Sequence, residues 1–268
     1  MHKKLFTLLV YIFAAIGFVL IVGFAAFKLG LMENNGTQQS GDYFNKSRLL
    51  VQNQTFDWMG TDEYKTLKET LPGEKNILLK VENETGVPSR LLVSILFVEQ
   101  MRLYNSDTEL FKKVFEPLKM LGVQSQYSWG VLGLKQDTLI QIENNLKTST
   151  STFYLGPSYE HTLDFSTNNS DAERFDRVTN EHDHYYTYLY AALFIKQIEK
   201  QWKDASFDIS NKPEILATLY NIGFAHSIPH NNPEVGGAVI HIANTDYSFG
   251  ELAYQFYYSN ELVDVFPK

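Results

Sequence analysis

Glu99 is the residue with the clearest chemical potential in this sequence, because it lies on the apolar face of a predicted helix over residues 88–104. The apolar residues that recur at helical spacing there are Leu92, Ile95, Leu96 and Leu103. Burial raises the pKa of a carboxyl group, and a carboxylic acid that stays protonated near neutral pH can donate its proton to a glycosidic oxygen. Alternatively, Glu99 lies at the edge of the face and pairs with Arg102 or another surface cation.

The segment 128–136 contains two glycines and a glutamine that could contact a sugar. Gly130 and Gly133 would let the backbone approach a sugar closely, because glycine has no side chain. The amide of Gln136 could hydrogen-bond an acetamido group or hold a water molecule. The structural alternative for the same residues is a plain turn between two helices.

Tyr220 and Asn221 lie at the end of a further predicted helix, just before Gly223. Tyr220 could orient Glu99, or it could be an ordinary core aromatic residue. Asn221 could hydrogen-bond the substrate, or it could cap the adjacent turn before the glycine. The residue types alone leave both pairs of alternatives open.

Three segments resemble, in the same order, motifs of the lysozyme-like superfamily of lytic transglycosylases and goose-type lysozymes. They read GVPSRLLVSILFVEQ at 86–100, SWGVLGLKQ at 128–136 and LATLYNIG at 216–223. The resemblance implies a lysozyme-like helical domain with Glu99 as the catalytic acid. The residues for which it implies substrate binding are Gly133, Leu134, Gln136, Tyr220 and Asn221.

The sequence also departs from the family pattern. Gln100 follows the glutamate where the family commonly has serine, Lys135 replaces methionine, and the stretch between Gln136 and Tyr220 is longer than typical. Two nearby carboxylates would support hydrolysis, whereas the transglycosylases of the family are understood to use one glutamate and the acetamido group of the substrate. Asp137 is close to the place of a goose-type aspartate but comes early, so a second carboxylate is not assigned.

The resemblance implies an enzyme that cleaves the β-1,4 bond between N-acetylmuramic acid and N-acetylglucosamine in the glycan strands of peptidoglycan. Glu99 would act as acid and then as base, with no cofactor and no metal. The alternative is a lysozyme-like module that binds glycan or a protein partner in a cell-envelope assembly without cleaving it. Gln100 and Lys135 favour this alternative, whereas Gln136 and Tyr220 favour the enzyme.

Helices are expected to position these residues, so the predicted fold class is mainly α. The further predicted helices cover 62–71, 74–84, 106–116, 185–202 and 213–222, and one more starts at Ser248. The helix at 185–202 is expected to begin through Asn180 with acidic residues in its first turn, and Glu251 is expected to complete a capping box with Ser248. The Ser-, Thr- and Asn-rich segment 147–170 predicts a long surface excursion.

Residues 5–27 are uncharged and almost wholly apolar, and at about 1.5 Å per residue they can cross a hydrocarbon core of ~30 Å. A cleaved secretory signal is the alternative, but its apolar stretch would be shorter. Lys3 and Lys4 precede the span, which favours a cytoplasmic N-terminus and an extracytoplasmic C-terminal domain. We therefore expect a single-pass protein of the cell membrane.

The predicted domain organisation has three parts. Residues 1–30 form a cytoplasmic stub and transmembrane anchor, residues 31–48 form a flexible polar tether, and residues 49–268 form the lysozyme-like domain. The net charge is −8, and without Lys3, Lys4 and Lys28 the 20 basic and 31 acidic residues that remain give −11. No basic stripe is visible, so nucleic acid is not an expected partner.

Cysteine is absent, which excludes disulfides, thiol nucleophiles and thiolate metal sites. The cluster from Glu181 to His184 contains two histidines and two acidic residues, and zinc is one interpretation of it. Adjacent ligands at a helix start usually point in different directions, and the chain has no HExxH motif. A solvated acidic helix start is therefore the favoured interpretation, and no metal site is predicted.

Overall fold

The computed structural model describes residues 11, 17–18, 39–40, 51–105 and 129–268. Contacts between residues divide the chain into two compact units, Met1–Asn35 and Gly36–Lys268. Apart from these few positions, the predicted anchor at 5–27, most of the tether at 31–48 and the predicted helix at 106–116 lie outside the described residues. Within the described part of the chain, no helix is long and apolar enough to span a membrane.

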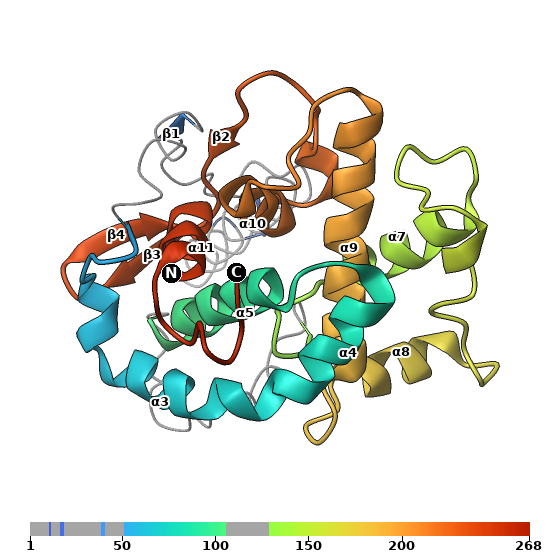
Figure 1. Cartoon of the computed structure of the whole chain (residues 1–268). Helices are drawn as coiled ribbons and strands as arrows, with labels where there is room; N and C mark the ends of the chain where they lie inside the picture. The colour runs from blue at the N-terminus through green and yellow to red at the C-terminus, as the bar shows by residue number, and fades with distance from the viewer. Residues whose placement is uncertain (1–10, 12–16, 19–38, 41–50, 106–128) are drawn as a thin grey trace, which may run out of the picture. The chain divides into compact units, whose positions relative to one another are not determined.

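The second unit is mainly helical, in agreement with the predicted fold class (Figure 1). Its α-helices are α3 (Asp62–Thr70), α4 (Lys75–Thr85), α5 (Ser89–Tyr104), α7 (Gln136–Lys147), α8 (Ser170–Val178), α9 (Tyr185–Asp204), α10 (Pro213–Ile222) and α11 (Phe249–Tyr258). Short 3-10 helices are η1 (Asp57–Gly60), η2 (Leu71–Glu74), η3 (Pro157–Tyr159) and η4 (Phe224–His226). Two short antiparallel strand pairs join β1 (Gln39–Ser40) to β2 (Glu234–Val235) and β3 (Val239–Ile242) to β4 (Thr245–Ser248).

Helix α5 is the element around which the others pack. Figure 1 shows it in the middle of the domain, and it contacts α3, α4, α9, α11 and β3. Every residue from Ser89 to Met101 is buried. The sequence predicts one apolar face, but the structure encloses this stretch of the helix on all sides, because segments from both ends of the domain cover it; only the last turn is partly exposed. Each polar side chain on α5 therefore needs a partner inside the protein.

The helices before α5 follow the predicted boundaries closely. The hydroxyl of Thr61 accepts a hydrogen bond from the backbone N–H of Tyr64 at 3.2 Å and caps α3. Pro72 and Gly73 end this helix by way of η2, after which α4 runs to a left-handed Gly86 with φ of 76°. Local capping and turn signals thus determine this part of the chain.

Helix α9 begins at the predicted residue, Tyr185, but it is not entered through Asn180. The side-chain oxygen of Asn180 accepts hydrogen bonds from the backbone N–H groups of His182 and Asp183, at 2.9 and 3.1 Å. These bonds close a turn outside the helix, and α9 starts later, at Tyr185, without acidic residues in its first turn. The expectation of entry through Asn180 is therefore wrong, because this side chain satisfies loop backbone rather than helix backbone.

Helices α7 and α8 are not among the predicted helices, and a buried polar cluster connects them with α9. The guanidinium of Arg174 donates to both carboxylate oxygens of Glu143, at 2.6 and 2.7 Å. The hydroxyl of Tyr190 donates to Oε1 of the same carboxylate at 2.6 Å. Because the three side chains come from three different helices, the cluster fixes their mutual arrangement.

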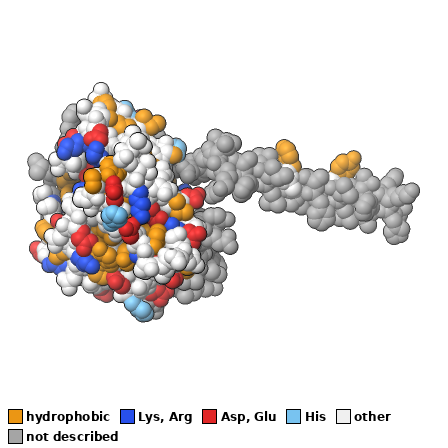
Figure 2. Space-filling model, turned by 90° about the vertical axis from the view of Figure 1, so that its right-hand side faces the viewer, with side chains coloured by type: hydrophobic (Ala, Val, Ile, Leu, Met, Phe, Trp, Pro, Cys, Tyr) orange, Lys and Arg blue, Asp and Glu red, His pale blue; other side chains and the backbone are white. Residues whose placement is uncertain are grey.

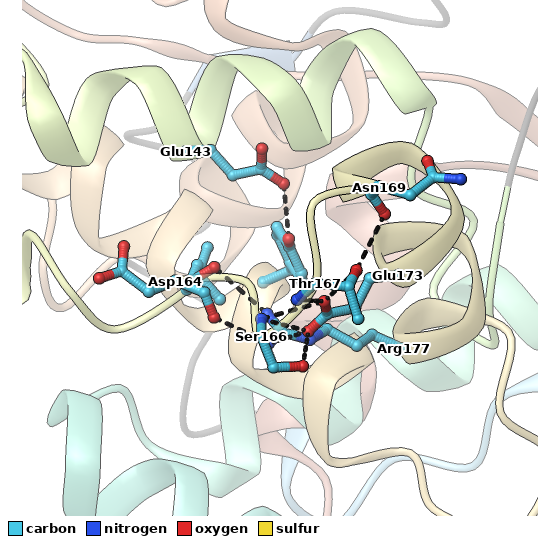
Figure 3. Close-up of polar contacts among 9 residues, drawn as sticks. Glu143, Asp164, Ser166, Thr167, Asn169, Glu173 and Arg177 are labelled. Carbon is cyan, nitrogen blue, oxygen red and sulfur yellow. Dashed lines mark hydrogen bonds and ion pairs between the residues drawn. The ribbon is translucent and has the colours of Figure 1, made fainter.

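The segment 147–170 contains no long helix or strand, as predicted, and its end is held by the first turn of α8 (Figure 3). The Glu173 carboxylate accepts backbone hydrogen bonds from Ser166 at 3.0 Å and from Thr167 at 2.8 Å. These hydrogen bonds lower the pKa of Glu173 to about 2, and the bond from the backbone N–H of Ser166 has the largest effect. Arg177 pairs with the same carboxylate at 2.6 Å.

The C-terminal helices begin at the predicted residues. Pro213 is the first residue of α10, and Gly223 follows the end of this helix with φ of 90°. The Ser248 hydroxyl accepts from the backbone N–H of Glu251 at 3.3 Å and caps α11. The hairpin of β3 and β4 was not predicted, because its strands have only four residues each.

Charged and apolar side chains are mixed on the surface of the domain. On the face shown in Figure 2, acidic and basic groups alternate with patches of hydrophobic side chains. Phe175, Ile228 and Val239 are the large hydrophobic residues of the second unit that stand out as exposed among those described. Isolated apolar residues of this kind are ordinary on a folded domain.

Arg90, in the first turn of α5, is fully buried, and its hydrogen bonds to the described residues all end on backbone carbonyl groups. The carbonyls that accept from it belong to Phe256, Tyr257, Ser259, Glu261 and Phe266. Several of them are left without helix partners at the end of α11, where a cation is favourable. Arg90 thus fastens the C-terminal segment to the central helix.

Replacement of Arg90 by lysine should therefore destabilise the domain strongly. A single ammonium group cannot reach five carbonyls, so we expect a loss of about 2–4 kcal/mol in the free energy of unfolding. Denaturant unfolding of the full chain measures it. The matched control is Lys147→Met, which removes the exposed ion pair with Asp164 and should cost at most about 1 kcal/mol. Equal effects of the two substitutions would contradict this role of Arg90.

Candidate functional site

Glu99 lies near the C-terminal end of α5 and is 3% exposed. Its Oε2 accepts from Nη2 of Arg102 at 2.7 Å and from Nε of the same side chain at 3.0 Å. Burial raises the pKa of Glu99, while the positive charges of Arg102 and then Lys135 oppose this rise. Both interpretations of Glu99 therefore contain a correct part: the carboxylate is buried as the first requires, and it is paired with Arg102 as the second requires.

Residues 129–134 form a tight turn that lies against this carboxylate. Trp129 and Leu134 exchange two backbone hydrogen bonds, of 2.7 and 3.0 Å, which close the turn. Gly133 has φ of 61°, and a Cβ atom added to it would lie 3.1 Å from Oε2 of Glu99. The structure therefore places Gly133 beside Glu99; the positive φ favours glycine there, and a side chain would press on the carboxylate.

Gly130 lies in the same turn and packs closely against other elements of the fold. It has φ of 69°, and an added Cβ atom would lie 2.5 Å from the carbonyl oxygen of Val178 and 3.0 Å from the side chain of Thr187. No side chain fits at that distance. Gly130 thus lets the turn pack against the end of α8 and the start of α9.

Two side chains from different helices hold the turn through neighbouring carbonyl groups. The amide of Gln100, on α5, donates to the carbonyl of Val131 at 2.9 Å. The hydroxyl of Tyr220, on α10, donates to the carbonyl of Leu132 at 2.9 Å. Both residues are buried. Gln100, which departs from the family pattern, therefore does provide a hydrogen bond next to Glu99, and its acceptor is the backbone of the turn.

Tyr220 is near Glu99 but supports it indirectly. Its hydroxyl group binds the carbonyl of Leu132 and so holds the turn that contains Gly133. Burial raises the pKa of Tyr220 well above its ordinary value, and the charge of Glu99 raises it further. Among the described contacts, Tyr220 orients the backbone beside the carboxylate.

The other residues that the resemblance assigned to substrate binding have different surroundings. Leu134 is buried and contributes to the core. Gln136 is exposed as the first residue of α7, and Asp137 is exposed next to it. Asn221 accepts a hydrogen bond from the backbone N–H of Ala238 at 2.8 Å, so it holds the loop before β3. The structure therefore brings Glu99, Gly133 and Tyr220 together, while Asn221 serves the loop.

Trp129 and Phe175 form an aromatic pair next to the turn that the sequence analysis did not single out. Their ring centroids are 5.1 Å apart and the rings are nearly perpendicular. Phe175 is 39% exposed. The sequence could have identified Trp129 as a site residue, because it is an aromatic residue directly before Gly130. It could not have identified Phe175 in this way, because helix α8 was not predicted.

The histidine cluster separates into one buried and three exposed side chains. His184 is buried, and its Nδ1 lies 3.0 Å from Oε2 of Glu74. The hydroxyl of Tyr188 donates to the same Oε2 at 2.8 Å. Glu181, His182 and Asp183 are exposed. Among the described residues, no group of three or more acidic or histidine side chains is arranged to hold a metal ion.

This arrangement can perform proton transfer with a single carboxyl group. Glu99 is buried enough to have a raised pKa, and the turn that contains Gly133 lies directly against its carboxylate. Comparison with known proteins adds no relative: no protein-family model, no curated protein and no solved structure shows a significant match to the chain.

Proposed function

We propose that this protein cleaves the β-1,4 bond between N-acetylmuramic acid and N-acetylglucosamine in peptidoglycan, as a lytic transglycosylase or muramidase with a lysozyme-like fold. The observation that carries the proposal is the position of Gly133 against the buried carboxylate of Glu99. The two residues come from the first and second motifs that resemble the superfamily, and Tyr220 of the third motif holds the same turn. Three separate segments thus meet at one carboxyl group.

In the proposed reaction, Glu99 first acts as a general acid. It donates its proton to the glycosidic oxygen while the bond between that oxygen and the anomeric carbon breaks. The carboxylate that remains then accepts a proton from the hydroxyl group that attacks the anomeric carbon. This hydroxyl belongs to water in hydrolysis and to the substrate itself in transglycosylation. Gln136, exposed at the start of α7, is available for contact with the glycan.

The proposal includes a single transmembrane anchor at residues 5–27, with the domain on the extracytoplasmic side. The length of the apolar run supports the span, and the preceding Lys3 and Lys4 support this orientation. Peptidoglycan lies outside the cell membrane, so an anchored domain on that side would reach it.

The second candidate function is a lysozyme-like module that binds glycan or a cell-envelope protein without cleavage. The ion pair between Glu99 and Arg102 favours it, because a paired carboxylate is stabilised in its ionised form. An ionised Glu99 would have no proton to donate. The two candidates therefore differ in whether the parent protein turns over its substrate.

Replacement of Glu99 by glutamine tests the enzymatic proposal. Glutamine keeps the shape and can still accept from Arg102, so the chain should fold, but it cannot donate a proton as an acid. We expect the release of soluble muropeptides from purified sacculi to be abolished, as measured by mass spectrometry. The control is Asp62→Asn, which alters an exposed carboxylate in α3 and should leave release unchanged.

Each result of this experiment has a defined meaning. Products with anhydro ends would identify a transglycosylase, and products with reducing ends a hydrolase. Undiminished release by Glu99→Gln would refute the role of Glu99. Sacculus binding by the parent without any product would select the binding module instead.

Replacement of Gly133 by alanine should impair catalysis more than folding. The added methyl group would press on Oε2 of Glu99 at 3.1 Å, so we expect at least a tenfold loss of muropeptide release. The matched control is Gly86→Ala, because Gly86 also has positive φ, of 76°, but an added Cβ there meets only Nζ of Lys196, at an ordinary contact distance of 3.8 Å. Both substitutions should cost about 1–2 kcal/mol of stability from backbone strain. Equal activity of the two variants would argue against the site.

A further inference from the structure

We propose that Arg102 is the positioning residue of Glu99: it holds Oε2, so that Oε1 is the oxygen that carries and delivers the catalytic proton. This inference rests on the proposed function and assigns a role that the family resemblance did not supply. It starts from the geometry of the ion pair. Both guanidinium contacts, from Nη2 at 2.7 Å and from Nε at 3.0 Å, end on the same carboxylate oxygen.

The surroundings of Oε2 distinguish it further from Oε1. The added Cβ of Gly133 would lie 3.1 Å from Oε2, so the backbone of the turn lies close to this same oxygen. Arg102 follows Glu99 by three residues on α5, which places the two side chains on one face of the helix. Oε2 is thus enclosed by the guanidinium and the turn.

The donor chemistry of arginine decides which oxygen is protonated. A guanidinium group has only N–H donors, and two of them already direct hydrogen atoms at Oε2. A proton on Oε2 would compete with these donors for the same lone pairs. The proton of a neutral Glu99 is therefore placed on Oε1, and a glycosidic oxygen must approach that atom.

Arg102 also affects the two halves of the proposed reaction differently. When Glu99 donates its proton from Oε1, the electron pair of the broken glycosidic bond stays on the leaving oxygen, which receives that proton. The carboxylate then bears a negative charge, and its bonds to Arg102 become charge-assisted and stronger. Arg102 therefore stabilises the state that follows proton donation, and burial of Glu99 stabilises the state before it.

Three groups on separate elements exert charge effects on Glu99 in the described part of the protein. They are Arg102 on α5, Lys135 directly before α7 and Tyr220 on α10. The two cations lower the pKa of Glu99, and burial raises it to a larger extent. The Arg102 side chain is 36% exposed, so a neutral side chain of similar length can replace it without leaving a buried void.

The test measures the pKa of Glu99 in the full chain by carbon-13 NMR of labelled glutamate carboxyl groups, with Glu99→Gln identifying the signal. In Arg102→Met the pKa should rise by about one unit or more relative to the parent, because the attraction that favours the carboxylate is removed. In Arg102→Lys the rise should be smaller, since the charge remains and the paired donors are lost. An unchanged pKa in Arg102→Met would overturn the inference.

The matched control is Lys65→Met, which removes a cation from another pair with i,i+3 spacing. Lys65 pairs with Asp62 at 2.7 Å, but both side chains are largely exposed and belong to α3. The pKa of Glu99 should stay at the parent value in this variant. A rise as large as that in Arg102→Met would mean that net charge, rather than the local pair, sets the pKa.

The pH dependence of muropeptide release provides the second readout. Activity of a general acid falls as the pH rises through its pKa, so the alkaline limb should move to higher pH in Arg102→Met, with at least a tenfold lower maximal rate. Arg102→Lys should recover part of that rate. A parent without product would refute the proposed function, whereas an active parent with an unshifted limb in Arg102→Met would refute the inference alone.

Discussion

The burial of α5 on all sides is the constraint on which the rest of this structure depends. A polar side chain in the buried stretch from Ser89 to Met101 cannot reach solvent, so it must be satisfied inside the protein, either within α5 or from elsewhere in the chain. Arg90 binds carbonyls in the last turn of α11 and in the segment after it, and Gln100 binds the turn at Val131. The partners that α5 needs thus fix where the C-terminal segment and the 129–134 turn must lie.

The sequence predicts those parts of the fold whose signals are local. Thr61, Pro213 and Ser248 start helices as expected, because capping and proline preferences act within a few residues. Helix α8 was missed because its sequence is largely polar, and its buried Arg174 is satisfied by Glu143 of α7 as well as by Asp171 of its own helix. The predicted role of Asn180 as the start of a helix was wrong for a related reason. Its side chain could cap either a helix or a loop, and tertiary packing decides between the two.

The sequence predicts which residues form the candidate site better than it predicts the role of each one. The helical spacing locates Glu99 on a buried surface, and the glycine at 133 indicates a close backbone approach. The roles of Tyr220 and Asn221 depend on contacts with Leu132 and with Ala238 across the fold, which neighbouring residues in the sequence do not determine. The proposed assignment of proton chemistry therefore rests on Glu99 and its immediate contacts.

The pair of Glu99 and Arg102 is difficult to explain as a device for stability. Removal of a carboxylate from water costs several kcal/mol, and two apolar side chains of similar volume would often stabilise such a position as well or better. Arg102 is partly exposed and so loses less hydration than its partner. Burial and Arg102 act in opposite directions on the pKa of Glu99, with burial the larger effect. A carboxyl group under two opposed influences gives up and regains a proton at moderate cost, which is the property that acid–base chemistry requires and that packing does not.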